Sequence, residues 1–327
     1  MNVYIRSVAA HVPERRVTND ELAESIDTSD EWIRSHTGIG ARHLSAPDEA
    51  ASDLALPAAQ KAMERAEVGP EDIDLVIVAT ASPDYIGFPA TASIIQDRLG
   101  LKHAGAFDLV AGCTGFVYGL ETARSMLMGG LFENILLVGV ETLSKITNWN
   151  DRNTCVLFGD GAGAAVISKT ESGESGIIDS ILRSEGSGAP HLIRRAGGSR
   201  EPVDSDHTPK EHFYLQMDGR QVYNFAVRVN TEVISNLLEK HGLGIDDIKW
   251  VVPHQANIRI IQAAAKRLKL PMEKFFVNIE EYANTSAASI PIALNELYES
   301  GGIERGDYLM FVGFGAGLTY GGNLLRW

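Results

Sequence analysis

Short, continuous apolar runs alternate along the chain with longer segments that carry apolar side chains at helical spacing. The runs at residues 73–79, 106–110 and 135–140 are typical of buried β-strands. The segments 51–67 and 116–128 place apolar side chains three and four positions apart, which predicts helices. Continuous apolar strands separated by helices indicate an α/β protein whose parallel or mixed sheet is covered by helices on both faces.

Polar signals interrupt this pattern in two regions. Capping boxes at Thr18-Asn-Asp-Glu21 and Thr28-Ser-Asp-Glu31 predict the starts of two short helices. The segment from about residue 171 to residue 211 is rich in serine, glycine, proline and charge, and only residues 176–182 resemble a strand. We therefore expect a connector with surface excursions there, followed by a long helix after Val222.

The second half of the chain repeats the pattern of the first. Residues 64–79 align without a gap with residues 239–254, and residues 129–139 correspond to residues 301–313. Such self-similarity implies a duplication. We expect the two copies to pack face to face about a pseudo-two-fold axis. The predicted halves are residues 1–172 and 173–327.

Between these repeated segments, each half opens a helix with a chemically distinctive residue. Cys113 opens the helix of the first half, and Asn284 opens a helix within a few residues of the equivalent position in the second. A pseudo-two-fold axis would bring the two helix starts together. His254, at the end of a predicted strand, would join them, because ligands of α/β sheets bind at such strand ends.

These three residue types suit nucleophilic catalysis. At a strand-to-helix junction, first-turn N–H groups and the helix dipole favour the reactive thiolate of Cys113. His254 can donate or hold a proton, and Asn284 is a neutral donor. Taken alone, Cys113 is equally compatible with a small core residue, and an isolated His254 is more often structural. Their predicted convergence favours catalysis.

The composition narrows the class of protein. With 327 residues, 44% of them hydrophobic, the chain can bury a large core in two domains or one large one. Two cysteines make no disulfide framework, so we expect a reducing, cytoplasmic compartment. The apolar runs are far shorter than the roughly 20 residues of a membrane span. A net charge of −14 argues against a nucleic-acid partner.

Three further patterns exclude other chemistries. Gly159-Asp-Gly-Ala-Gly163 lacks the Lys-Ser/Thr of a P-loop and the context of a dinucleotide fingerprint, so we expect close packing at the duplicated core. Cys155 is predicted to be a core residue. No close Cys/His pair has zinc-ligand spacing, so no metal site is expected.

A series of motifs makes the whole chain resemble the β-ketoacyl-acyl carrier protein synthase III family, condensing enzymes with the thiolase-like fold. This resemblance implies an α/β structure of two duplicated halves in αβαβα layers. The motifs run in family order from end to end. They are Thr28-Ser-Asp-Glu-Trp-Ile33 with Thr37-Gly-Ile39, Ala111-Gly-Cys-Thr-Gly115, Phe158-Gly-Asp-Gly-Ala-Gly-Ala164, Val252-Pro-His-Gln-Ala-Asn-Ile-Arg259, Asn284-Thr-Ser-Ala-Ala-Ser289 and Gly313-Phe-Gly-Ala-Gly-Leu-Thr-Tyr-Gly321.

The resemblance implies a homodimeric acyltransferase that starts fatty-acid synthesis without a cofactor or metal. A short acyl-CoA, with acetyl-CoA favoured, would acylate Cys113 and release CoA. Malonyl-acyl carrier protein would then lose CO₂, and its carbanion would attack the acyl-cysteine to give 3-oxoacyl-acyl carrier protein. His254 and Asn284 would stabilise the enolate, and the backbone N–H groups of Cys113 and Ala316 would hold the tetrahedral oxyanion.

The same resemblance also implies which residues line the acyl pocket and the CoA channel. Phe88 matches a loop residue that crosses the dimer interface and closes the partner's acyl pocket, which favours a short primer. Two positions depart from the family pattern and bear on CoA affinity, since His36 stands where many relatives have arginine and Tyr223 where some have phenylalanine. The residues implied to line the CoA and phosphopantetheine channel are Trp32, Arg152, Tyr223, Ala256 and Asn257.

A basic surface is predicted on an otherwise acidic protein. The predicted helix 256–268 leaves Arg259, Lys266 and Arg267 outward. Such a run of charges is more often simply a solvated face. The resemblance implies that Arg259 helps to dock the acidic carrier protein, and this favours a docking role for all three.

Two other functions remain open from the sequence alone. One is a related condensing enzyme or acyltransferase of secondary metabolism on the same scaffold. The other is a catalytically silent scaffold that binds acyl carriers, against which the intact Cys113, His254 and Asn284 argue. A degradative thiolase would need a second active-site cysteine, and none stands between Gly313 and Gly322.

Overall fold

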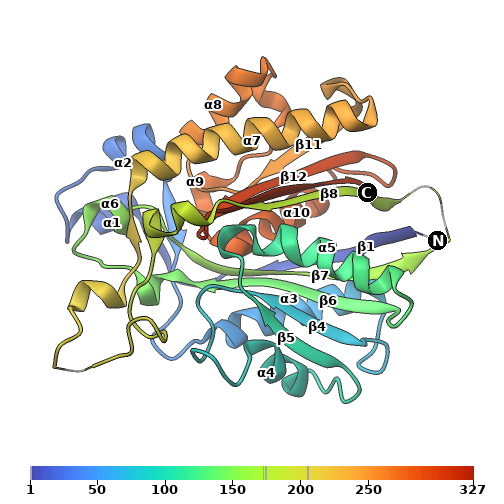
Figure 1. Cartoon of the computed structure of the whole chain (residues 1–327), viewed down its shortest axis with the longest axis horizontal. Helices are drawn as coiled ribbons and strands as arrows, with labels where there is room; N and C mark the ends of the chain where they lie inside the picture. The colour runs from blue at the N-terminus through green and yellow to red at the C-terminus, as the bar shows by residue number, and fades with distance from the viewer. Residues whose placement is uncertain (1, 172, 174, 205) are drawn as a thin grey trace.

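Two β-sheets form the centre of the computed structural model, which describes residues 2–171, 173, 175–204 and 206–327 (Figure 1). The first sheet has the strand order β1-β7-β6-β4-β5, with β1 (Asn2–His11), β7 (Asp160–Thr170), β6 (Asn134–Thr142), β4 (Leu75–Ala79) and β5 (Gly105–Leu109). The second has the order β11-β12-β13-β8, with β11 (Ile248–Pro253), β12 (Tyr308–Gly315), β13 (Thr319–Arg326) and β8 (Gly176–Ser184).

The two sheets share one topology. Strands β1, β7, β6 and β4 pair in the same order and sense as β8, β13, β12 and β11, with one parallel and two antiparallel pairs in each set. This confirms the duplication predicted from the sequence, and β5 is an addition at the edge of the first sheet. Strand β7 ends at Thr170 and β8 begins at Gly176, on either side of the predicted boundary. Residue 172, at that boundary, lies outside the described residues.

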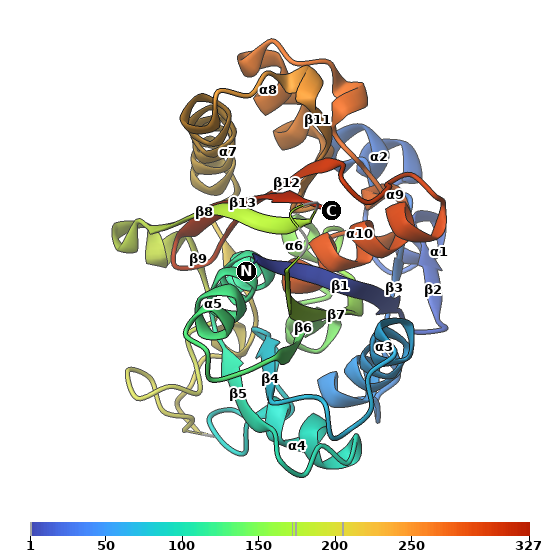
Figure 2. The ribbon, with the colours of Figure 1, turned by 90° about the vertical axis from the view of Figure 1, so that its right-hand side faces the viewer.

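In the central strands, alternating side chains bury both faces of each sheet, whereas the edge strand β5 is only partly buried, contrary to the expectation of a buried strand at residues 106–110. In β4, Leu75 and Ile77 pack into the core between the sheets, whereas Val76 and Val78 pack into the outer core. The resulting αβαβα layering matches the predicted fold (Figure 2). The inner helices are α5 (Gly115–Met128) and α10 (Ser289–Glu299); the outer ones are α3 (Ala51–Ala66) and α4 (Thr91–Arg98) on the first sheet, and α7 (Gly219–His241) and α8 (Ile258–Leu268) on the second.

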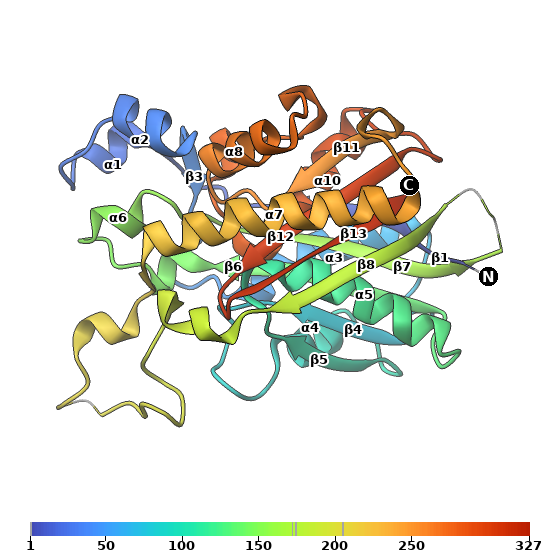
Figure 3. The same cartoon turned by 45° about the horizontal axis from the view of Figure 1, so that its top comes forward.

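Short elements cluster near one end of the sheets, where α2 lies beside α8 (Figure 3). Thr18 caps α1 as predicted, but α2 is capped by Ser29 rather than Thr28, because the Ser29 hydroxyl accepts a hydrogen bond from the Trp32 N–H at 3.1 Å. These elements are β2 (Arg16–Thr18), α1 (Asn19–Ala23), α2 (Asp30–Thr37), β3 (Ala41–His43), α6 (Arg152–Cys155) and α9 (Ile279–Tyr282).

The predicted connector is largely irregular in its described residues. After β8 it contains short 3₁₀ turns at Gly186–His191 and Lys210–Phe213. It also contains β9 (Leu192–Ile193), which pairs with β10 (Gln216–Met217). The expected strand at residues 176–182 is confirmed and extends to Ser184.

The glycines of residues 159–163 serve close packing, as expected. A Cβ on Gly163 would lie 2.6 Å from the Cβ of Pro291, and one on Gly161 would lie 2.9 Å from Ile292. Strand β7 therefore approaches α10 more closely than a side chain would allow. Cys155 is completely buried, which confirms its core position. In the described part of the chain, no helix combines the length and apolarity needed to span a membrane.

Candidate active site

Cys113 lies in a one-turn 3₁₀ helix, Gly112–Thr114, between β5 and α5. The turn is pressed against the end of β12. A Cβ on Gly315 would overlap the backbone nitrogen of Cys113, and one on Gly112 would lie 2.8 Å from the backbone nitrogen of Ala316. Gly112 also has a φ of +54°, in the left-handed region that glycine tolerates best. Glycine at these two positions therefore brings the backbone N–H groups of Cys113 and Ala316 close together.

Asn284 lies on the equivalent turn of the second half and is almost fully buried. Its backbone N–H donates to the Leu157 carbonyl at 2.9 Å, and its carbonyl accepts from the Gly159 N–H at 3.0 Å. The side-chain Oδ1 accepts a hydrogen bond from the Ser286 N–H at 2.9 Å. That bond fixes the orientation of the amide and leaves its NH₂ group as the available donor.

His254 follows the last residue of β11, and its backbone N–H donates to the Val312 carbonyl at 2.8 Å. The ring Nδ1 lies 2.7 Å from the Ser289 hydroxyl, which has no other acceptor among the described residues. We therefore assign the hydroxyl as donor to Nδ1, which places the ring proton on Nε2. Nε2 is buried without a hydrogen-bond partner in the described chain, so the Nε2–H group of His254 is a donor with no acceptor there.

A pocket of about 230 Å³ brings the predicted catalytic residues together. Cys113, His254 and Asn284 all line it, with Gly315 and Phe314 beside them. Residues from both halves of the chain close the rest of its wall. They are Trp32, His36, Thr37, Asn153, Val156, Leu157, Phe158, Leu192, Met217, Gly219, Val222, Tyr223, Ala256, Asn257 and Ile260.

The same pocket contains most of the predicted CoA residues. The Arg152 guanidinium lies over the Trp32 ring at 4.1 Å, and His36 stacks on Trp32 with ring centroids 4.4 Å apart. Asn257 caps α8 through its Oδ1, and its Nδ2 donates to the His36 carbonyl at 3.1 Å. The Asn257 amide is therefore already used to tie α2 to the start of α8.

Comparison with known proteins identifies the family. Two family models match the chain: "3-Oxoacyl-[acyl-carrier-protein (ACP)] synthase III" over residues 107–186 and its "C terminal" model over residues 238–327. A β-ketoacyl-[acyl-carrier-protein] synthase III from Symbiobacterium thermophilum is 50% identical over 99% of this chain and 98% of its own. The chain belongs to the 3-oxoacyl-[acyl-carrier-protein] synthase III family.

Further members of this synthase III family agree over the full length. A synthase III from Caldanaerobacter subterraneus subsp. tengcongensis is 48% identical over 99% of this chain and 97% of its own. The crystal structure of the Thermus thermophilus synthase III superposes with a TM-score of 0.91 at 47% identity, covering 99% of this chain and 98% of that one. The predicted family and the thiolase-like fold are thus confirmed.

Burial keeps Cys113 and His254 of this synthase III pocket neutral. Burial raises the pKa of the Cys113 thiol to about 12, although hydrogen bonding by Ser286 opposes the shift. Burial likewise lowers the pKa of His254 to about 3. The expectation that the helix start favours a thiolate is wrong, because the loss of hydration outweighs the N–H groups of one short turn.

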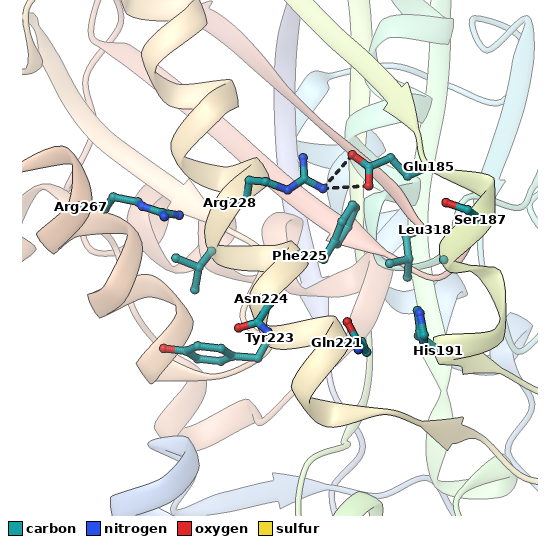
Figure 4. Close-up of a pocket in the computed structure, with 12 residues that line it drawn as sticks. Glu185, Ser187, His191, Gln221, Tyr223, Asn224, Phe225, Arg228, Arg267 and Leu318 are labelled. Carbon is teal, nitrogen blue, oxygen red and sulfur yellow. Dashed lines mark hydrogen bonds and ion pairs between the residues drawn. The ribbon is translucent and has the colours of Figure 1, made fainter.

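The remaining predicted residues of the synthase III lie outside this pocket. Phe88 is 89% exposed on the loop after β4. Arg259, Lys266 and Arg267 are exposed on α8. Arg267 also lines a second groove of about 590 Å³, which shares Tyr223 with the first pocket (Figure 4). Among residues 2–171, 173, 175–204 and 206–327, no group of three His, Cys, Asp or Glu side chains is arranged to hold a metal ion.

Sequence reasoning missed two partners of the site. Ser289 is hydrogen-bonded to His254, which lies 35 positions away in the sequence. The bond was missed although Ser289 ends the family motif that begins at Asn284. Glu141, buried near the end of β6, accepts a hydrogen bond from Ser286 across 145 positions. No local pattern signals either bond, because each joins segments that only the fold brings together.

We predict that His254 stays uncharged from about pH 5 to pH 9, because its pKa is lowered by burial from 6.5 to about 3. NMR of ring-labelled histidine should give a His254 signal that does not shift over this range, with added imidazole titrating in the same sample. The stability from burying the neutral ring is complete above pH 6.5 and is lost as the pH falls toward about 3. A His254 signal that titrates near 6.5 would contradict this.

Proposed function

We propose that Cys113, His254 and Asn284 carry out the decarboxylative condensation of an acyl-CoA with malonyl-acyl carrier protein. As a synthase III, the protein is an acyltransferase that starts fatty-acid synthesis. The observation that carries the residue assignment is the shared pocket, in which a thiol meets two unused N–H donors. We also propose that residues 1–172 supply the nucleophile and residues 173–327 the two donors, as the duplicated halves of one enzyme.

The first half-reaction is a thioester exchange at Cys113. The sulfur attacks the acyl carbonyl carbon of the acyl-CoA, the bond from that carbon to the CoA sulfur breaks, and the proton lost by Cys113 ends on the CoA thiol. The N–H groups of Cys113 and Ala316 are close enough to share the oxyanion of the tetrahedral intermediate. Acyl-Cys113 and free CoA result.

The second half-reaction uses the two side-chain donors of the same pocket. Nε2–H of His254 and the NH₂ of Asn284 hydrogen-bond the thioester oxygen of the malonyl group. They stabilise the enolate that forms when the carbon–carbon bond to CO₂ breaks. The enolate carbon then attacks the acyl carbon, and collapse of the intermediate expels the Cys113 sulfur. A neutral His254 suits this role, since it must donate a hydrogen bond without needing to titrate.

The same pocket suits the CoA and phosphopantetheine groups. Trp32 offers a flat ring for an adenine, and Arg152 offers a guanidinium for phosphate. Arg152 covers the Trp32 ring at 4.1 Å, so an arriving adenine must displace it from that ring. Tyr223, Ala256 and Asn257 line the same pocket as Trp32 and Cys113. The small pocket favours a short primer such as acetyl-CoA.

We predict that His254→Ala or Asn284→Ala lowers the rate of CO₂ release from malonyl-carrier protein by about 100-fold, because each removes one donor to the enolate. Acylation of Cys113 should remain measurable by intact-protein mass after incubation with acetyl-CoA. Cys113→Ala is the control that abolishes the acyl adduct. Wild-type rates of CO₂ release in both donor variants would refute the role assignment.

The basic surface of α8 suits the acidic carrier protein. Lys266 and Arg267 are exposed and make no ion pair within the described part of the chain. Arg259 reaches back to the Ser35 carbonyl at 3.0 Å, beside the entrance formed by α2. Arg267 faces the groove that Tyr223 shares with the pocket (Figure 4). A carrier docked here would hold its phosphopantetheine next to the pocket entrance.

We predict that Arg259→Glu raises the KM for malonyl-carrier protein about tenfold and spares the KM for acyl-CoA, because the charge reversal repels only the acidic protein. Lys249→Glu is the matched control, since Lys249 is exposed on β11 at the strand end away from His254. Steady-state kinetics with each substrate varied in turn measure both constants. Equal changes in the two KM values would count against a docking role.

Exposed apolar side chains beside the edge strand β5 are suited to a homodimer interface. Strand β5 ends the first sheet, and its outer edge is unpaired within the described chain. Because β4 and β5 are parallel, with Ala79 opposite Leu109, the segments that follow them emerge at the same end. These segments expose large apolar side chains that a second copy would cover, with Phe88 reaching the partner's acyl pocket. They are Tyr85, Ile86, Phe88 and Val110, between 58% and 89% exposed.

We predict that the protein sediments at twice the mass of one chain and that Phe88→Glu weakens the dimer at least about tenfold, because a carboxylate would be buried at the interface. Leu131→Glu is the matched control. Leu131 is 77% exposed but precedes β6, at the opposite end of the strands. Sedimentation velocity over a range of concentrations measures both variants. A monomeric wild-type protein would end the dimer proposal.

The state of the two cysteines supports a reducing cellular compartment. Both Cys113 and Cys155 are free thiols. A nucleophilic thiol persists in a reducing environment, and this supports the cytoplasm as the location.

A further inference from the structure

A buried carboxyl group, Glu141, lies close to the proposed catalytic residues and is used by no step of the proposed reaction. It stands near the end of β6 and none of its surface is exposed. It accepts hydrogen bonds from the Ser82 hydroxyl at 2.5 Å and from the Ala81 N–H at 3.1 Å. It also accepts one from the Ser286 hydroxyl at 2.8 Å. One side chain therefore joins the segment after β4 to the turn that follows Asn284.

Ser286 connects this carboxyl group to both catalytic turns. Its backbone N–H holds the Oδ1 of Asn284 at 2.9 Å, and its side chain acts to lower the pKa of the Cys113 thiol. Ser286 also has a φ of +47°, a left-handed conformation that costs a non-glycine residue free energy. Such a conformation persists only where surrounding bonds determine it, and the bond to Glu141 is one of them.

Tight backbone packing leaves this junction little freedom. A Cβ on Gly139, two residues before Glu141, would overlap the carbonyl oxygen of Ala287. A Cβ on Gly115, two residues after Cys113, would lie 3.1 Å from the Cβ of Ala287. Strand β6, the Cys113 turn and the Ser286 turn therefore meet at one point. The hydrogen bond from Ser286 to Glu141 joins the Ser286 turn to β6.

The charge of Glu141 also reaches Cys113. Burial raises the pKa of Glu141 to about 7, while the hydrogen bonds from Ser82, Ser286 and the backbone oppose the shift. The negative charge of Glu141 acts to raise the pKa of Cys113, whereas the Ser286 side chain acts to lower it. The two linked residues thus have opposite effects on the thiol, which a test can exploit.

We propose that Glu141, acting through Ser286, is a positioning residue for the condensation step, holding the turn of Asn284 in register with the turn of Cys113. This inference rests on the proposed roles of those two residues. In this arrangement Glu141 touches neither substrate. Its contribution is the fixed direction of the Asn284 NH₂ group, which must meet the malonyl thioester oxygen.

Two conservative variants and one control test this proposal. Glu141→Gln keeps the shape and removes the charge, and it leaves one oxygen acceptor for the hydroxyls of Ser82 and Ser286, which in the wild-type protein each have their own. Ser286→Ala removes the bond between Ser286 and Glu141 from the other side and leaves Glu141 intact. Asp179→Asn is the control, because Asp179 is a largely buried carboxyl group on β8 that is hydrogen-bonded to His241 and to the Ser180 N–H.

We predict that Glu141→Gln and Ser286→Ala each lower the rate of CO₂ release about tenfold, the effect of one misplaced hydrogen bond. The KM for malonyl-carrier protein and the extent of Cys113 acylation by acetyl-CoA should stay near wild type. Because both variants break one bond, the double variant should lose no more than either alone. At pH 8, alkylation of Cys113 by iodoacetamide should be faster in Glu141→Gln and slower in Ser286→Ala.

Several outcomes would overturn the proposal. An equal loss in Asp179→Asn would show a general cost of altering a buried carboxyl group. Additive losses in the double variant would show that Glu141 and Ser286 act independently. Alkylation rates that shift in the same direction in the two single variants would show the same. Failure of the proposed function is recognised independently, since Asn284→Ala would then release CO₂ at the wild-type rate.

Discussion

The close approach of two equivalent turns, one from each half of the chain, is the constraint on which this structure depends. The turn of Cys113 presses against Gly315 at the end of β12, and the turn after Asn284 presses against Gly139 in β6. In each case a Cβ would overlap backbone atoms, so a substitution would move the turn rather than a flexible side chain. Each half thus accommodates the other's turn, and the pocket exists only where both halves are folded together.

Burial at this meeting point sets the electrostatic character of the pocket. The imidazole of His254 and the thiol of Cys113 are both neutral, since charged forms would lose their hydration. Neutral donors that line one pocket suit a reaction in which negative charge develops only transiently on an oxygen. The pocket holds these donors through Ser289 and Ser286, so their direction does not depend on substrate.

The region around Trp32 is likewise formed by segments that are distant in the sequence and are joined by hydrogen bonds. Trp32 and His36 come from α2, near the N-terminus, while Asn257 and Arg259 come from the start of α8. The bond from Asn257 to the His36 carbonyl joins these two elements. The surface that would receive a carrier protein and the ring that would receive an adenine are therefore parts of one rigid junction, close to the pocket they serve.

The sequence by itself determined the elements, their duplication and the residues capable of chemistry. Strands such as β4 and helices such as α3 follow from local periodicity, and the repeat in the chain pointed to Cys113, Asn284 and His254 as neighbours. Only the tertiary structure decided that Cys113 is a neutral thiol, that Ser289 orients His254 and that Glu141 joins Ser286. The physical reason is that periodicity reports on neighbours along the chain, whereas hydration and hydrogen bonding in a buried pocket depend on residues that lie far apart in sequence and meet only after folding.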